Sequence, residues 1–159
     1  MEGTRRENRP PPKGECGVRT ARRRAREIAL QALYAWQLAG GDALAQAQML
    51  EGWERCDAQL AEELIRGVTA RRAELEAAIA PCLDRAIERL SPVERAILLI
   101  GAYELAERRD TPFKVVLNEA IELGKGYGGT DGHKFVNGVL EKLALALRAG
   151  EVARARQTA

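Results

Sequence analysis

The chain has 159 residues, 46% of them hydrophobic, which is enough to build the core of one compact domain and argues against disorder throughout. The formal net charge is only +2, but the charges are unevenly distributed. Residues 1–26 hold nine Lys and Arg against three Asp and Glu (+6), whereas residues 27–159 hold sixteen Lys and Arg against twenty Asp and Glu (−4). An anionic partner is therefore expected at the N-terminus. No apolar run could span a bilayer, no hydrophobic signal core is present, and Cys16, Cys56 and Cys82 form no C-x-x-C pair, so we expect a cytoplasmic protein without a disulfide framework or a zinc site.

Residues 1–19 contain the stretch RPPPKGECG and show no apolar periodicity. They are predicted to form a flexible, basic, Pro-rich tail. The first helix follows this tail, and the pair Gly40-Gly41 ends it. At about 100° per residue, one face of the helix is apolar and is the predicted core side: Ala25, Ala29, Ala32, Leu33 and Trp36.

Four arginines open this helix, namely Arg22, Arg23, Arg24 and Arg26. A helix N-terminus carries the positive end of the macrodipole, where each exposed cation costs about 0.3 to 1 kcal/mol. Arg22 and Arg26 also repel each other, because they lie one turn apart. An anionic partner would turn these unfavourable charges into favourable contacts. Alternatively, the four arginines form only a solvated charged face.

A second apolar line runs along the same helix through Leu30, Tyr34 and Leu38, roughly opposite Trp36. A helix packed on one side only would not need this line. Either other helices of the chain cover both faces, or Tyr34 belongs to a docking surface for another protein, where tyrosine is favoured.

Capping residues predict two further helices in the first half of the chain. Asp42 is placed to cap a helix that runs through about Trp53, and a third helix runs from near Asp57 to Ala80, where Pro81 stops it. The apolar stripe of the third helix consists of Leu60, Leu64, Val68, Leu75 and Ile79.

The second half of the chain is also predicted to be helical. In SPVE, Ser91 is placed as N-cap, Pro92 at the first helical position and Glu94 at the third. The run AILLIGAYELA that follows is apolar nearly all round, which predicts a helix buried at the centre of the fold. Thr111-Pro112 repeats the cap-and-proline pattern and opens another helix. The last helix has an ordinary amphipathic stripe, formed by Val136, Val139, Leu140, Leu143 and Leu147.

Two features could belong to a cofactor-binding or catalytic site, but neither has the neighbouring elements or residues that such a site requires. GKGYGG matches G-x-G-x-x-G, but a dinucleotide site needs a preceding strand and a helix precedes this segment, so we interpret it as a helix end and a tight loop. His133, the only histidine, has no metal or catalytic partners at a recognisable spacing, and we expect it to make polar capping or surface hydrogen bonds. The sequence therefore contains no positive evidence for an enzyme, a metal or a cofactor.

Three long segments resemble bacterial transcription antitermination factors of the NusB family, in order and at family spacing. They are RRRAREIALQALYAWQL, SPVERAILLIGAYELAER and TPFKVVLNEAIELGKGYGGTDGHKFVNGVLEKL. The resemblance extends from about Thr20 to Leu147 and is weak between Asp42 and Leu83. It implies an all-α fold of two three-helix subdomains, at about 20–80 and 81–149, packed as one compact helical domain. Residues 150–159 are expected to be a flexible C-terminal tail.

The resemblance also implies a function. NusB-like proteins bind the boxA element of nascent, single-stranded RNA together with NusE, a protein of the small ribosomal subunit. They thereby join the Nus complex on RNA polymerase, which opposes termination, notably in ribosomal RNA operons. This role involves no catalysis and no cofactor.

Matching positions imply the site residues. The arginine cluster matches the family's arginine-rich RNA-binding segment, and Lys134 and Phe135 match positions at its RNA surface. The Phe135 ring either stacks on a base or packs at the edge of the core. Asp131 lies beside both residues, where it either faces RNA or caps the last helix. Tyr34 and Glu94 match positions at the NusE surface of the family.

Two departures from the family pattern leave other interpretations open. The tail before Thr20 is longer than is usual, and Gly132 stands where a serine is common. NusB-like domains also occur in RNA cytosine methyltransferases, although this chain has no room for a cofactor domain. A helical interaction scaffold would bind NusE without any preference for RNA.

Overall fold

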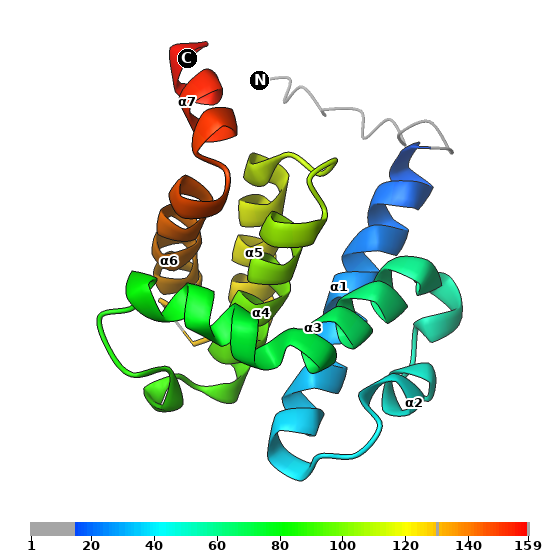
Figure 1. The fold of residues 1–159 in the computed structure, drawn as a ribbon. Coiled ribbons are helices and arrows are strands. Elements are labelled where there is room, and N and C mark those ends of the chain that lie inside the picture. Colours follow the sequence, from blue (N-terminus) through cyan, green and yellow to red (C-terminus); the bar gives the residue numbers. More distant parts are fainter. Residues whose placement is uncertain (1–14, 130, 159) are drawn as a thin grey trace, which may run out of the picture.

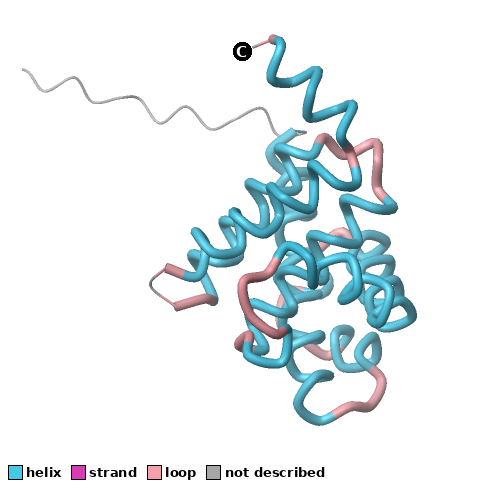
Figure 2. The backbone as a smooth tube through the Cα atoms, turned by 60° about the vertical axis from the view of Figure 1, so that its left-hand side comes forward, coloured by secondary structure: helices cyan, strands magenta, loops and turns pink. Residues whose placement is uncertain are grey.

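The computed structural model describes residues 15–129 and 131–158, and every element in that part of the chain is helical (Figure 2). The α-helices are α1 (Glu15–Ala39), α2 (Ala43–Gln48), α3 (Ala58–Ile79), α4 (Pro92–Glu107), α5 (Phe113–Tyr127), α6 (Gly132–Leu147) and α7 (Ala149–Gln157). Short 3-10 turns join them at η1 (Trp53–Arg55), η2 (Ala80–Cys82) and η3 (Ile87–Arg89). The predicted all-α fold is confirmed. No helix in the described ranges is long and apolar enough to cross a membrane.

Helix α4 lies at the centre of the fold, as its apolar composition predicts. All residues in the run Ala96–Leu105 are buried, and α4 packs against α1, α3, α5 and α6. Helix α3 crosses in front of both α1 and α4 (Figure 1). Its close approach to α4 requires Gly67, because a Cβ atom there would lie 2.1 Å from the Tyr103 ring. The subdomain boundary near residue 80 stays a prediction.

The predicted capping residues act as expected at three helix starts. The side chains of Asp42, Asp57 and Ser91 accept hydrogen bonds from backbone N–H groups three residues later, at 3.0, 3.1 and 3.1 Å. Gly40 and Gly41 end α1 with positive φ angles of 70° and 86°, which side chains disfavour. Helix α2 ends at Gln48, earlier than predicted, and turns at residues 49–52 lead to η1.

Both ends of the chain differ from the prediction. Helix α1 begins at Glu15, so residues 15–19 are helical, and residues 1–14 lie outside the described ranges. Residues 150–157, expected to be a flexible tail, belong to helix α7, whose Val152 is 5% exposed. Thr111 does not cap α5. Instead the backbone N–H of Phe113 donates to Glu151 of α7 at 2.9 Å.

Arg148, between α6 and α7, explains why α7 is held against the body of the protein. Its side chain is 1% exposed, and its five N–H donors all have acceptors. Four of these acceptors are backbone carbonyls at and after the end of α4, in Glu104, Leu105, Arg108 and Thr111, at 2.6 to 2.9 Å. The fifth is Glu151, at 3.2 Å. The guanidinium therefore caps α4 and also neutralises the negative end of its dipole.

Candidate nucleic-acid interface

The arginine cluster divides into exposed and buried members. The side chains of Arg22 and Arg23 are 52% and 47% exposed, and Arg24 is half-buried. Arg22 has only a distant ion pair, 3.9 Å from Asp57, and within the described residues no ion pair forms at Arg24. The guanidinium groups of Arg22 and Arg24 are therefore available to an anionic partner.

Arg26 is not available, which corrects its predicted place in the RNA surface. It is 5% exposed and donates to both carboxylate oxygens of Glu104, with its Nε at 3.2 and 3.1 Å and its Nη2 at 2.8 Å. Glu104 is 1% exposed. A buried charge requires a partner of opposite sign, and this pair satisfies both residues inside the protein. Arg26 therefore links α1 to α4 and does not reach the surface.

Glu119 of α5 lies between the exposed and buried arginines. Its carboxylate accepts hydrogen bonds from Arg23 at 3.2 and 3.3 Å, and it lies 3.9 Å from Arg26. The hydrogen bond to Glu119, followed by the negative charge of Glu119, raises the pKa of the Arg23 guanidinium. The geometry thus holds Arg23 in a fixed orientation against α5, with half of its side chain still exposed.

Helix α5 connects this arginine surface to the start of α6. Arg23 of α1 donates to Glu119 of α5. Eight residues further along both helices, Gln31 donates to the Tyr127 hydroxyl. Helices α1 and α5 therefore run side by side in the same direction. Gly124 contacts the start of α6 so closely that a Cβ atom there would lie 2.8 Å from His133 Cα. At 1.5 Å per residue, Glu119 and Gly124 are only about 8 Å apart along α5.

The start of α6 places the second group of predicted residues on the surface. Asp131 and Lys134 are 77% and 73% exposed and pair at 3.5 Å. Asp131 makes no side-chain hydrogen bond to the helix, so its capping role is not realised. Phe135 is half-buried and packs against the core at its edge, and stacking of the ring on a base stays a prediction. An exposed cation and a partly exposed ring thus lie side by side at one helix end.

Arg85 and Glu119 also belong to this region, and sequence reasoning did not identify them. The Arg85 guanidinium lies over the Phe135 ring, 4.8 Å from its centroid. Arg85 stands in a loop with no helical period, and Glu119 lies in a helix where paired acids suggest only a solvated face. Neither position carries a sequence signal, because both contacts depend on how distant segments pack.

The two residues predicted at the NusE surface lie near the same end of the molecule. Tyr34 is 40% exposed, one turn before Gln37, whose side chain donates to the Pro92 carbonyl at 3.0 Å. Glu94 follows in the first turn of α4 and is half-buried, and its Oε1 lies 3.7 Å from where a Cβ atom of Gly132 would be. Glu94 therefore lies close to the start of α6. Leu38 is 61% exposed, whereas Leu30 is buried, so only part of the second apolar line is covered.

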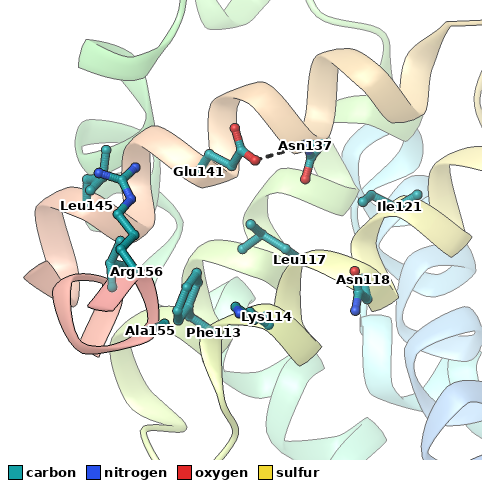
Figure 3. Close-up of a pocket in the computed structure, with 11 residues that line it drawn as sticks. Phe113, Lys114, Leu117, Asn118, Ile121, Asn137, Glu141, Leu145, Ala155 and Arg156 are labelled. Carbon is teal, nitrogen blue, oxygen red and sulfur yellow. Dashed lines mark hydrogen bonds between the residues drawn. The ribbon is translucent and has the colours of Figure 1, made fainter. Parts of the chain in front are cut away.

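A groove of about 510 Å³ lies elsewhere, between α5, α6 and α7 (Figure 3). Its apolar floor includes Leu117 and Ile121, and Asn137 and Glu141 face each other along its side at 3.4 Å. Leu117 and Glu119 differ by two positions, about 200° around α5, so the groove is on the face away from α1. None of the predicted site residues lines it. Within the described ranges, no group of His, Cys, Asp and Glu side chains could hold a metal ion.

Known proteins are similar to this chain in both sequence and fold. The NusB family model matches residues 23–145. The transcription antitermination protein NusB of Paraburkholderia phytofirmans is 50% identical over 143 residues, which cover 88% of this chain and 99% of that protein. NusB of Nitrosomonas europaea is 49% identical over 149 residues, 90% of this chain and 89% of that protein.

Solved structures agree with these relatives. T. maritima NusB superimposes with a TM-score of 0.72 at 30% identity, covering 82% of this chain and 96% of that chain. NusB in a crystal structure with NusE and double-stranded RNA has a TM-score of 0.70 at 27% identity, covering 78% and 96%. The family match spans most of the described residues and the identities are far above chance, so the chain belongs to the NusB family of transcription antitermination proteins.

Proposed function

We propose that this transcription antitermination protein binds the boxA element of nascent RNA together with NusE. The observation that carries the proposal is the juxtaposition of the exposed arginines of α1 with Lys134 and Phe135 at the start of α6, on either side of α5. Arginine and lysine contact phosphates, and an aromatic ring stacks on an unpaired base. A short single strand crossing α5 would meet both groups.

NusE is the proposed protein partner, and Tyr34 with Glu94 is its proposed contact surface. The support is that both residues lie near the start of α4, next to the start of α6, so that one partner could contact protein and RNA together. Through this complex the protein would join the other Nus factors and RNA polymerase in the cytoplasm, notably on ribosomal RNA operons. The proposed role is binding without catalysis, cofactor or metal.

Neutralising the exposed arginines tests the proposed RNA surface. The triple variant R22Q/R23Q/R24Q is expected to bind boxA RNA at least tenfold more weakly at low salt. The slope of log affinity against log salt should flatten by about 2, because each lost phosphate contact on a single strand removes about 0.7. Fluorescence anisotropy titrations at several salt concentrations measure both quantities.

The matched control is R109Q/R154Q/R156Q, which removes the same charge from three exposed arginines outside the proposed surface. It should retain most of the affinity. Equal losses in the two triple variants would show a general attraction for polyanions. The titrations should use boxA RNA, scrambled RNA and duplex RNA, with and without NusE, because the NusB complex described above contains double-stranded RNA.

Removing the Asp131 charge is expected to strengthen RNA binding. The carboxylate is exposed beside Lys134 and makes no capping bond, so D131N should remove one like-charge contact with phosphate and leave stability within about 0.5 kcal/mol. A gain of up to about 1 kcal/mol, or about fivefold in affinity, is expected at such a solvated surface. Affinity and melting temperature are measured on the same protein, with D110N as the control. A lower melting temperature with unchanged affinity would instead indicate a capping role.

A further inference from the structure

The Phe135 ring has a cation stacked on it in the free protein. The Arg85 guanidinium carbon lies 4.8 Å from the centroid of the ring, within the range of a cation–π contact. The two residues come from different segments, since Arg85 precedes η3 and Phe135 lies in the first turns of α6. The contact therefore joins the loop after α3 to the proposed RNA surface.

The two residues differ in how firmly they are held. Phe135 packs against the hydrophobic core on its inner side. Arg85 is 45% exposed, and outside the ring its bonds are to the neighbouring Asp84, from Nε to Oδ1 at 2.9 Å and from Nη2 to Oδ2 at 3.5 Å. These bonds also lower the pKa of Asp84. The ring is thus a fixed surface, and the guanidinium is a planar group on an exposed loop that can move away from it.

Both groups have the chemistry that holds an unpaired base. Single-stranded RNA is bound by stacking bases on aromatic rings and on arginine guanidinium planes, and by cations along the phosphates. Lys134, next to the ring in the sequence, is 73% exposed and supplies such a cation. We propose that Arg85 contacts RNA directly, as the movable wall of a base-stacking site whose fixed wall is Phe135. This inference rests on the proposed function and adds a residue that neither the arginine cluster nor the start of α6 contains.

The test measures the affinity of Arg85 variants for a single-stranded boxA RNA without NusE. We expect R85A to bind about five- to tenfold more weakly than the unaltered protein. R85K keeps the charge and loses the plane, so it should recover the salt dependence and only part of the affinity. In R85A/F135A the loss should be smaller than the product of the two single losses, because both variants remove walls of one site.

The control is R89A, which removes an equally charged, exposed arginine from η3, four residues further along the chain, and should change the affinity less than twofold. Thermal melting of each variant verifies that the fold is intact. Unchanged or tighter binding by R85A would overturn the inference, since Arg85 would then only cover the ring. A loss no larger than that of R89A would overturn it as well.

Failure of this inference can be distinguished from failure of the proposed function. If R22Q/R23Q/R24Q loses boxA binding while R85A does not, the RNA surface stands and Arg85 lies outside it. If the unaltered protein shows no preference for boxA over scrambled RNA, both are overturned.

Discussion

The variant R26M is expected to lose about 3 to 5 kcal/mol of unfolding free energy, although Arg26 belongs to a cluster that resembles an RNA-binding segment. Removing the guanidinium leaves the Glu104 carboxylate buried in the last turn of α4, where it is 1% exposed and has no other side-chain hydrogen bond within the described residues. A buried charge without a partner is strongly unfavourable. Urea unfolding followed by circular dichroism measures the loss.

The double variant R26M/E104M separates an uncompensated charge from lost packing. It replaces both ions by apolar side chains and should recover most of the stability, because a buried ion pair and an apolar pair of similar volume are often nearly equivalent. Its boxA affinity should match that of the unaltered protein. A loss below about 1 kcal/mol in R26M, or weaker RNA binding by the folded double variant, would contradict the buried role of Arg26.

Arg148 carries the second large expected effect. The variant R148M should lose at least about 3 kcal/mol, because four carbonyls around the end of α4 lose a charged donor and hydrogen bonds to charged groups contribute about 1.5 to 3 kcal/mol each. The substitution should also detach α7, since Glu151 of α7 would lose its ion pair with Arg148. Hydrogen exchange at the backbone amide of Phe113, which donates to Glu151, reports this detachment.

The control is R154M, which changes an exposed arginine on α7 itself and should stay within about 0.5 kcal/mol. R148K offers three donors in place of five and should be intermediate. If R148M were as stable as R154M, solvent would have to satisfy those carbonyls, and α7 would not depend on Arg148.

The parts of the fold that could be predicted are those that local chemistry determines. Ser91, Asp42 and Asp57 cap helices because a short polar side chain can reach a backbone N–H three residues later, whatever the rest of the chain does. The central position of α4 also follows from local composition, since a helix with no polar face must be covered on all sides.

The burial of Arg26 could have been detected from helical spacing. Arg26 lies one turn before Leu30 and two turns before Leu33, on a face that becomes buried. Glu104 is the only charged residue in the run from Ala96 to Leu105. Two opposite charges, each in an apolar setting, indicate a buried pair. The motif treats the four arginines as one group because they are of the same type. The helical face on which each arginine lies shows that Arg26 differs from the others.

Helix α7 and the Arg85 contact could not be predicted in this way. α7 has no side-chain cap at its start and buries only Val152, so its place depends on Arg148 and Glu151 reaching segments almost forty residues away. The stacking of Arg85 on Phe135 joins residues fifty positions apart without any shared period. Tertiary packing determines both.

At the proposed RNA surface, a phosphate that binds Arg23 would have to displace Glu119. Its carboxylate already occupies donors of Arg23 that an arriving phosphate would use. The net gain of that contact is therefore the difference between two ion pairs, and a single small anion gains little from it. A polymer that makes several such exchanges at once adds the small differences together. At the proposed RNA surface, the position of one carboxylate would thus favour long polyanions over free phosphate, without any contact to a base.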